Sequence, residues 1–213
     1  MRLDAWIIAL KKTLRASEQD RPEIENRRRE WQERQQQMDT TRLIFIDESC
    51  AKTNMTRLYA RAKGGTRARD SAPHGHWNAT TMLGSIRLDG RNASMTLDGA
   101  TDGAAFGEYV RHVLTPTLRA GDIVVWDNLS AHRSAVAREA IEAVGAQILP
   151  LPPYSPDLNP IEKMWSKVKA LLRAAKARTK EELHKAIGLA LQAVTPEDAL
   201  GWFQSCGYTA SQS

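Results

Sequence analysis

Cysteine and long apolar runs are what this sequence most clearly lacks. Its two cysteines, Cys50 and Cys206, form neither a disulfide framework nor the paired spacing of a zinc site, which indicates a reducing compartment. No apolar run approaches the roughly 20 residues that cross a bilayer, and the N-terminus has no apolar signal-peptide segment. Internal repeats and low-complexity tracts are absent as well. The sequence therefore predicts a cytoplasmic protein with no membrane partner.

The rest of the composition is ordinary. Hydrophobic residues make up 42% of the chain and charged residues 26%, which excludes disordered and fibrous classes. A length of 213 residues fits one domain with short appendages and is ample for a buried core.

Positive charge is concentrated in two stretches of the chain. Residues 52–91 carry eight Lys and Arg against two Asp and Glu, and residues 161–185 carry eight against three. Residues 92–160 have the opposite balance, four against eight, and the first 41 residues are nearly neutral at nine against eight. Two such basic stretches are typical of a surface that binds a polyanion such as nucleic acid. Solvated faces of ordinary surface elements are the alternative.

The first half of the sequence predicts helices followed by antiparallel strands. Polar helices are expected over residues 5–36, interrupted near Pro22. Short apolar or alternating runs then predict strands. These strands are residues 43–46, ended by Asp47, and residues 57–60, 79–88 and 94–97, with an Asp89-Gly90 turn between the last two.

From residue 103 onward helices and strands alternate. The pattern predicts a helix from 103 to just before Pro116, a strand at 123–126, a helix at about 131–143 and a strand at 148–149. Ser130 and Gly145 are the expected caps of the helix at 131–143. Further helices are expected from Pro160, at 180–193 and at 196–204. The fold class is therefore α/β, with a mixed sheet of antiparallel and parallel strands flanked by helices.

Three acidic residues stand at the ends of apolar runs. Asp47 follows the run at 43–46, and Asp127 follows the one at 123–126. Glu162 lies in the first turn of the helix that begins at Pro160, after a stiff, proline-rich approach. Three converging carboxylates are what a protein needs to hold two divalent metal ions against a phosphodiester.

Each acid also has a purely structural alternative. Asp47 is suited to capping a turn, and Glu48 beside it points to the opposite face of a strand, so only one of the two can face a site. Glu162 stands three residues after Asn159, which is the spacing of a capping box.

The order and context of the acids resemble a known family. The segments LIFIDES at 43–49, WDNLSAHRS at 126–134 and LPPYSPDLNPIEKMW at 151–165, with 34 residues between Asp127 and Glu162, resemble the DDE catalytic domain of mariner-type transposases. Their bacterial insertion-sequence relatives are the most similar branch. The likeness covers about residues 10–208 and includes ASEQDRPEI at 16–24, PHGHW at 73–77 and GDIVVWDN at 121–128.

This resemblance implies a ribonuclease H-like fold with Asp47 and Asp127 on neighbouring strands. It implies that Asp47, Asp127 and Glu162 bind two Mg²⁺ ions, for which Mn²⁺ can substitute, and catalyse DNA strand cleavage and strand transfer. Oxygen ligands suit these ions better than zinc. Further residues are expected near the site or on DNA. Those near the site are Glu48, Asn128, His132 and Asn159, and those on DNA are Lys163, Lys167, Lys169, Arg173, His74 and His76.

Two alternatives remain for individual residues. His132 either lies near the scissile phosphate or begins a helix, and a structural role near the site is the favoured interpretation. His74 and His76 flank a glycine, where a surface loop is the common outcome.

The resemblance also sets expectations for organisation and partners. Residues 1–41 are expected to form a helical linker or brace, residues 42–208 the catalytic domain and residues 209–213 a tail. No helix-turn-helix module is visible. The chain is therefore expected to be either the second product of a split reading frame, whose upstream product reads the DNA, or a truncated remnant. Element terminal repeats and target DNA would be its substrates, bound by a homodimer at the nucleoid. The alternative function is a non-catalytic DNA-binding remnant that assembles with full-length transposase or inhibits it.

Overall fold

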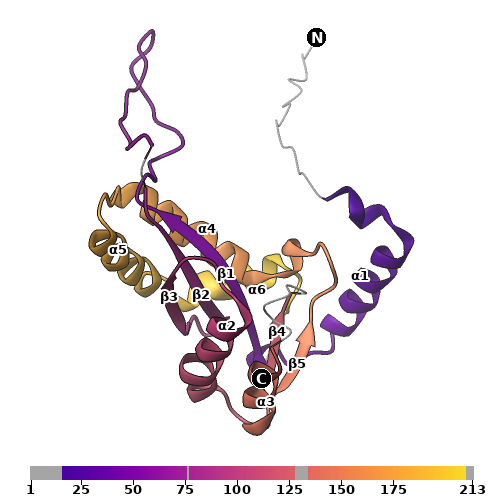
Figure 1. The fold of residues 1–213 in the computed structure, drawn as a ribbon. Helices are drawn as coiled ribbons and strands as arrows, with labels where there is room; N and C mark the ends of the chain where they lie inside the picture. Colours follow the sequence, from indigo (N-terminus) through magenta and orange to yellow (C-terminus); the bar gives the residue numbers. More distant parts are fainter. Residues whose placement is uncertain (1–15, 76, 128–133, 210–213) are drawn as a thin grey trace, which may run out of the picture.

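A five-stranded mixed sheet forms the centre of the molecule in this computed structural model, which describes residues 16–75, 77–127 and 134–209 (Figure 1). The strand order is β3-β2-β1-β4-β5. β1 pairs antiparallel with β2, and β2 with β3, whereas β4 is parallel to both β1 and β5. The strands are β1 (Leu43–Lys52), β2 (Ala79–Arg87), β3 (Ser94–Asp98), β4 (Ile123–Trp126) and β5 (Gln147–Pro150).

The expected mixed sheet is therefore confirmed, but two details of the prediction are wrong. β1 does not end at Asp47, because residues up to Lys52 continue the ladder with β2. The segment 57–60 is not a strand. β2 begins opposite the end of β1, so residues 57–60 lie in the connection between them, where Leu58 and Tyr59 are exposed. The described part of this connection, residues 53–75 and 77–78, extends away from the sheet (Figure 1).

Six α-helices are described, and proline or a capping side chain marks the start of most of them. α3 begins after Ser134, whose hydroxyl accepts a hydrogen bond from the Ala137 amide. Ser134 therefore takes the place expected of Ser130, which lies outside the described residues. Gly145 has a φ of 77° just beyond α3, as expected of a residue that ends a helix. The helices are α1 (Pro22–Gln35), α2 (Gly103–Tyr109), α3 (Ala135–Ala143), α4 (Pro160–Ala175), α5 (Lys180–Gln192) and α6 (Pro196–Ser205).

Shorter helical turns connect these elements. A π-helical turn and a 3₁₀ turn continue α2 through the expected end at Pro116. The other 3₁₀ turns precede α1, β1 and α4. The turns are Ser17–Asp20, Thr40–Arg42, Val110–Leu114, Thr115–Thr117 and Pro156–Leu158. None of the helices in the described part of the chain has the length and apolar character needed to cross a membrane.

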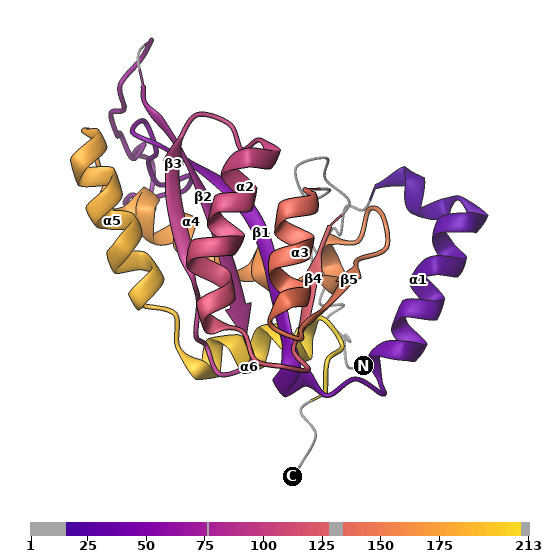
Figure 2. The same ribbon diagram turned by 60° about the horizontal axis from the view of Figure 1, so that its bottom comes forward.

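The helices cover the sheet on both faces. Ile44 and Ile46 of β1 pack in one apolar cluster with residues of α2 and α3. Leu43 and Phe45 point to the other face and pack with residues of α4, α5 and α6. These three helices lie on that side of the sheet in Figure 2. α1 lies beyond β5, at the edge of the sheet, and contributes Trp31 to this second cluster. Odd-numbered residues of β1 therefore face α4, and even-numbered residues face α2 and α3.

Gly84 on β2 is the point of closest approach between the sheet and α4. A Cβ atom at this position would lie 2.7 Å from Cη2 of Trp165 and 3.0 Å from Oγ of Ser94. Gly84→Ala is therefore expected to lower the free energy of unfolding by about 1–3 kcal/mol, the usual range for overpacking a core. Chemical denaturation measures this difference.

Gly188→Ala is the matched control. Gly188 lies within α5, and a Cβ atom there would have nothing within 4 Å. Alanine in a helix interior stabilises by roughly 0.5–1 kcal/mol relative to glycine, so this variant should be more stable than the parent. Equal effects of the two substitutions would contradict the close contact between Gly84 and Trp165.

Candidate active site

Asp47 lies on β1, and Asp127 directly follows β4, the parallel strand next to β1. The ladder between β1 and β4 pairs Leu43 with Ile123 and Phe45 with Val125. The same offset, continued by two residues, aligns Asp47 with Asp127. Neighbouring strands are about 4.8 Å apart, so these two carboxylates start from adjacent backbone positions at the carboxyl ends of the parallel strands.

Both aspartates belong to the sheet face that α4 covers. Asp47 pairs with Gly84 across β1 and β2, and Trp165 of α4 lies against Gly84. Asp47 is only 8% exposed, so its carboxylate is held in a largely buried position. Val125 packs in the α4-side cluster, and the alternation along β4 continues to Asp127.

Glu48 lies on the opposite face of the sheet from Asp47. It continues the series of Ile44 and Ile46, which face α2 and α3. One of its carboxylate oxygens, Oε2, is buried and has no hydrogen-bond partner. Of the neighbouring acids in β1, only Asp47 therefore faces α4.

Glu162 occupies the third position of α4, and it does not form the capping box that its spacing permits. Asn159 is the N-cap residue, but its side chain makes no capping hydrogen bond. By contrast, complete capping boxes are present at the starts of α5 and α6, made by Thr179 with Glu182 and by Thr195 with Asp198. The capping-box alternative for Glu162 is therefore wrong.

The electrostatic environment of Glu162 connects it to Asp127. Desolvation by the surrounding protein raises the pKa of the Glu162 carboxyl, the positive charge of Lys169 opposes this, and the negative charge of Asp127 raises the pKa further. The residue also reaches solvent at the surface of α4. The carboxyls of Glu162 and Asp127 are thus close enough to interact, although 34 residues separate them in the sequence.

Asn159 carries a polar atom that the fold leaves unsatisfied. The residue is 4% exposed, and its Oδ1 is buried without a hydrogen-bond partner. Such an atom costs about 1–3 kcal/mol unless a partner is supplied. The expected role of Asn159 near the site stays a prediction, and its buried acceptor lies at the start of the helix that carries Glu162.

The expected basic contacts divide between two faces of α4. Lys169 and Arg173 follow Glu162 by seven and eleven residues, and these spacings place all three on one helix face. Lys163 and Lys167 lie on a different stripe. The ammonium group of Lys167 pairs with Asp198 of α6 and donates to the Ala193 carbonyl at 2.8 Å. Lys167 therefore joins α4 to α6, and its expected contact with DNA stays a prediction.

The remaining predicted residues lie in exposed or undescribed segments. His74 is exposed in the connection between β1 and β2. Asn128, His132 and His76 are outside the described residues.

Carboxylate oxygens dominate the donor set at this edge of the sheet, which suits Mg²⁺ and Mn²⁺. Within residues 16–75, 77–127 and 134–209, no three His, Cys, Asp or Glu side chains gather closely enough to enclose one metal ion. A two-ion site shares its carboxylates between ions about 4 Å apart, so it does not require three acids around either one.

Sequence reasoning missed the contacts that secure the approach to α4. Arg28 of α1 binds Asp157 and Ser155, and Gln19 donates to the carbonyl of Tyr154. Periodicity did not reveal these contacts because polar residues on a polar helix look like solvent-facing residues. A charge pairing between the PDL segment and the upstream helix was the available signal.

Comparisons with known proteins agree with this geometry. A family model described as DDE superfamily endonuclease matches residues 42–184. No curated protein matches the chain. Among solved structures, the chain is similar to the Mos1 transposase paired-end complex with left transposon end, with 18% identity, a TM-score of 0.71, and coverage of 95% of this chain and 64% of that one.

Two further structures show the same likeness. The mariner Mos1 paired end complex with Mg has 17% identity and a TM-score of 0.70 over 97% of this chain and 64% of that one. The catalytic domain of Mos1 mariner transposase has 14% identity and a TM-score of 0.62 over 92% of both chains. This chain thus spans 64% of the length of the Mos1 chains in the paired-end complexes.

At these identities the structural likeness concerns the fold, and it confirms the ribonuclease H-like sheet expected from the sequence. The family match covers more than half of the sequence and includes all three acids. The chain therefore belongs to the DDE superfamily of endonucleases.

Proposed function

We propose that this chain is the catalytic part of a transposase of a bacterial insertion sequence, which cleaves DNA strands and transfers them to a new site. Asp47, Asp127 and Glu162 are the proposed metal-binding and catalytic residues. The main support is the register of β1 and β4: continued two residues beyond the Phe45–Val125 pair, it sets Asp47 beside Asp127 on the face covered by α4, the helix that carries Glu162. The influence of Asp127 on the pKa of Glu162 is independent support.

The proposed cofactors are two Mg²⁺ ions, with Mn²⁺ as a substitute. The donor set favours these ions, and Mos1 structures with Mg and with Mn are among the similar folds. Bound ions of this kind activate an attacking water or 3′-hydroxyl and stabilise the leaving oxygen of a phosphodiester. Asp47 and Asp127 would hold their ligand oxygens from rigid strands, and Glu162 would do so from the first turn of α4.

The proposed substrate is DNA. Lys169 and Arg173 share the face of α4 that carries Glu162, where phosphate groups would be held in register with the acids. Lys163 and the exposed His74 are weaker candidates for the same role, as is His76. The basic residues of the connection 53–78 extend the positive surface beyond the sheet.

The proposed organisation follows the resemblance to mariner-type enzymes. Residues 42–208 form the catalytic domain and residues 1–41 a linker, with residues 209–213 as a tail. A helix-turn-helix module, supplied by an upstream reading frame or by a longer form of the protein, would recognise the element ends. Two copies would act on paired ends in the bacterial cytoplasm, at the nucleoid. The Mos1 paired-end complexes, which contain transposon ends, support this arrangement by analogy.

Cleavage of DNA that carries the element's ends tests this function. The substrate is a supercoiled plasmid containing the chromosomal segments that flank the coding sequence, with the upstream-frame product present or absent. We expect strand cleavage that requires Mg²⁺ or Mn²⁺ and is abolished by EDTA. Folded protein that binds this DNA but cleaves it in neither mixture would instead support the non-catalytic remnant.

A further inference from the structure

The segment that leads into α4, residues 154–158, is bound by α1, the helix that lies beyond β5 at the edge of the sheet. Arg28 of α1 donates from Nη2 to one carboxylate oxygen of Asp157 at 2.6 Å and from Nη1 to the other at 3.0 Å. The same guanidinium donates to Oγ of Ser155 at 2.6 Å. A two-pronged contact between arginine and a carboxylate fixes direction as well as distance. Arg28 therefore sets the position of Ser155 and Asp157 relative to α1.

Gln19 and Trp31 also connect this segment to α1 and to the turn before it, Trp31 through the Tyr208 hydroxyl. Nε2 of the buried Gln19, just before α1, donates to the carbonyl of Tyr154 at 2.6 Å. Tyr154 has a φ of 56°, a conformation that non-glycine residues adopt only when their surroundings impose it. Nε1 of Trp31 donates to the Tyr208 hydroxyl at 3.2 Å, and that hydroxyl donates to the Leu158 carbonyl at 2.9 Å. Hydrogen bonds therefore hold the segment from residue 154 to residue 158.

These contacts take the place of a capping side chain, which α4 lacks at its start. α5 and α6 are fixed at their starts by capping boxes, whereas no side chain caps α4. Only Asn159, Pro160 and Ile161 separate the anchored Leu158 from Glu162. The fixed φ of proline transmits the direction of the incoming chain to the first turn of the helix. The position of Glu162 thus depends on the segment that Arg28 holds.

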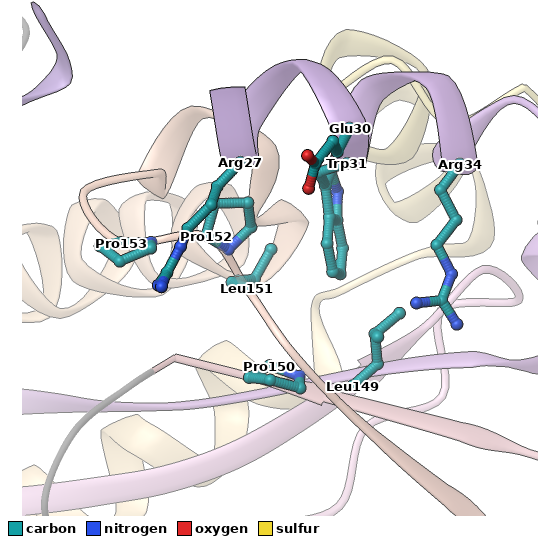
Figure 3. Close-up of a pocket in the computed structure, with 9 residues that line it drawn as sticks. All are labelled: Arg27, Glu30, Trp31, Arg34, Leu149, Pro150, Leu151, Pro152 and Pro153. Atoms are coloured by element: carbon teal, nitrogen blue, oxygen red, sulfur yellow. The ribbon is translucent and has the colours of Figure 1, made fainter. Parts of the chain in front are cut away.

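A pocket opens between α1 and the edge of the sheet. A cavity of about 370 Å³ lies between α1 and the end of β5 with the residues that follow it. In Figure 3, Trp31 points from α1 toward Leu151, with Arg27 near the prolines and Arg34 near Leu149. Trp31 packs α1 against the core, and Arg28 makes three hydrogen bonds from α1 to the segment before α4.

We propose that Arg28 is a positioning residue for Glu162: by holding Asp157 and Ser155 against α1, it fixes the start of α4 in the orientation that metal binding requires. Its catalytic consequence rests on the proposed function, whereas its structural consequence does not. Asp157 is 54% exposed as a side chain, so the ion pair contributes little to overall stability. Loss of the pair should change geometry and leave the protein folded.

Arg28→Gln tests the proposal, and Arg29→Gln is the matched control. Arg29 is the next residue on α1, is exposed and donates a hydrogen bond to the nearby Asn26, its one side-chain hydrogen bond within the described part of the chain. For Arg28→Gln we expect faster amide hydrogen exchange in residues 154–162 and about tenfold weaker Mn²⁺ binding, measured by electron paramagnetic resonance. The Mg²⁺ concentration for half-maximal cleavage should rise by a similar factor. Arg29→Gln should match the parent in all three measurements.

Two further variants keep the outcome decisive. Arg28→Lys retains the positive charge but cannot donate to both oxygens of Asp157 at once, so its amide exchange and Mn²⁺ affinity should lie between those of the parent and of Arg28→Gln. The exchanged pair Arg28→Asp with Asp157→Arg should recover Mn²⁺ affinity relative to either single variant. Unchanged amide exchange and Mn²⁺ affinity in Arg28→Gln would overturn the proposal. Changed exchange and affinity in a protein whose parent never cleaves DNA would leave the positioning role standing and remove the proposed activity.

Discussion

Asp127→Asn is expected to abolish DNA cleavage while DNA binding persists. Asparagine has nearly the same shape, but its neutral amide cannot match a carboxylate as a metal ligand. Asp127 follows β4 where the register with β1 extends toward Asp47, and its charge acts on Glu162, so losing that charge should weaken metal binding at the whole group. Changes around a metal ligand typically cost ten- to a hundredfold, so loss of a ligand itself should cost more than about a hundredfold in cleavage rate. Cleavage under single-turnover conditions and DNA binding by gel shift are the measurements.

Asp89→Asn is the control for the loss of one negative charge. Asp89 lies in the turn after β2, at the opposite end of the sheet, and its side chain is 50% exposed. Its substitution should leave cleavage at the parent rate. The double variant Asp47→Asn with Asp127→Asn should be no slower than either single variant, because residues that act as a unit are not additive. Independent, multiplying losses would contradict a shared metal site.

The strands and helices that form the site could be predicted from local sequence. The run Leu43–Ile46 is apolar throughout because the central strand is buried on both faces, and Ile123–Trp126 has the same property. Pro160 marked the start of α4 because proline suits the first helical position. These signals depend on each residue and its immediate neighbours, so they survive without knowledge of the fold.

The pairing between distant segments could not be predicted in the same way. The register that aligns Asp47 with Asp127 depends on where two strands 80 residues apart meet, and no local pattern records it. β1 continues past Asp47 because β2 supplies a partner up to Lys52, although a charged residue usually suggests a strand end. The capping box at Glu162 was locally plausible and is absent. Tertiary contacts such as the hydrogen bonds from Arg28 to Asp157 act on the segment before α4, and no local pattern reveals them.

Asp122→Ala is expected to lower the free energy of unfolding strongly, because it breaks a buried ion pair. Nη2 of Arg87, at the end of β2, lies 2.5 Å from Oδ2 of Asp122, just before β4, and the two side chains are 7% and 3% exposed. The Asp122 carboxylate also accepts a hydrogen bond from the Arg119 amide at 2.7 Å. Removing it leaves the arginine charged and buried without its counterion. Such a loss costs about 3–5 kcal/mol.

This cost should appear as a fall of roughly 6–20 °C in melting temperature. Glu142→Ala, which breaks the exposed pair with Arg138 on α3, should cost less than about 1 kcal/mol. Replacing both partners, as Arg87→Met with Asp122→Leu, should recover most of the lost stability, because no unpaired charge then remains buried. Asp122 lies at the end of the sheet opposite the three acids, since it precedes β4 and Asp127 follows it. Cleavage per folded molecule should therefore stay at the parent rate, and a cleavage defect in folded Asp122→Ala would show that the buried pair also sets the geometry of the site.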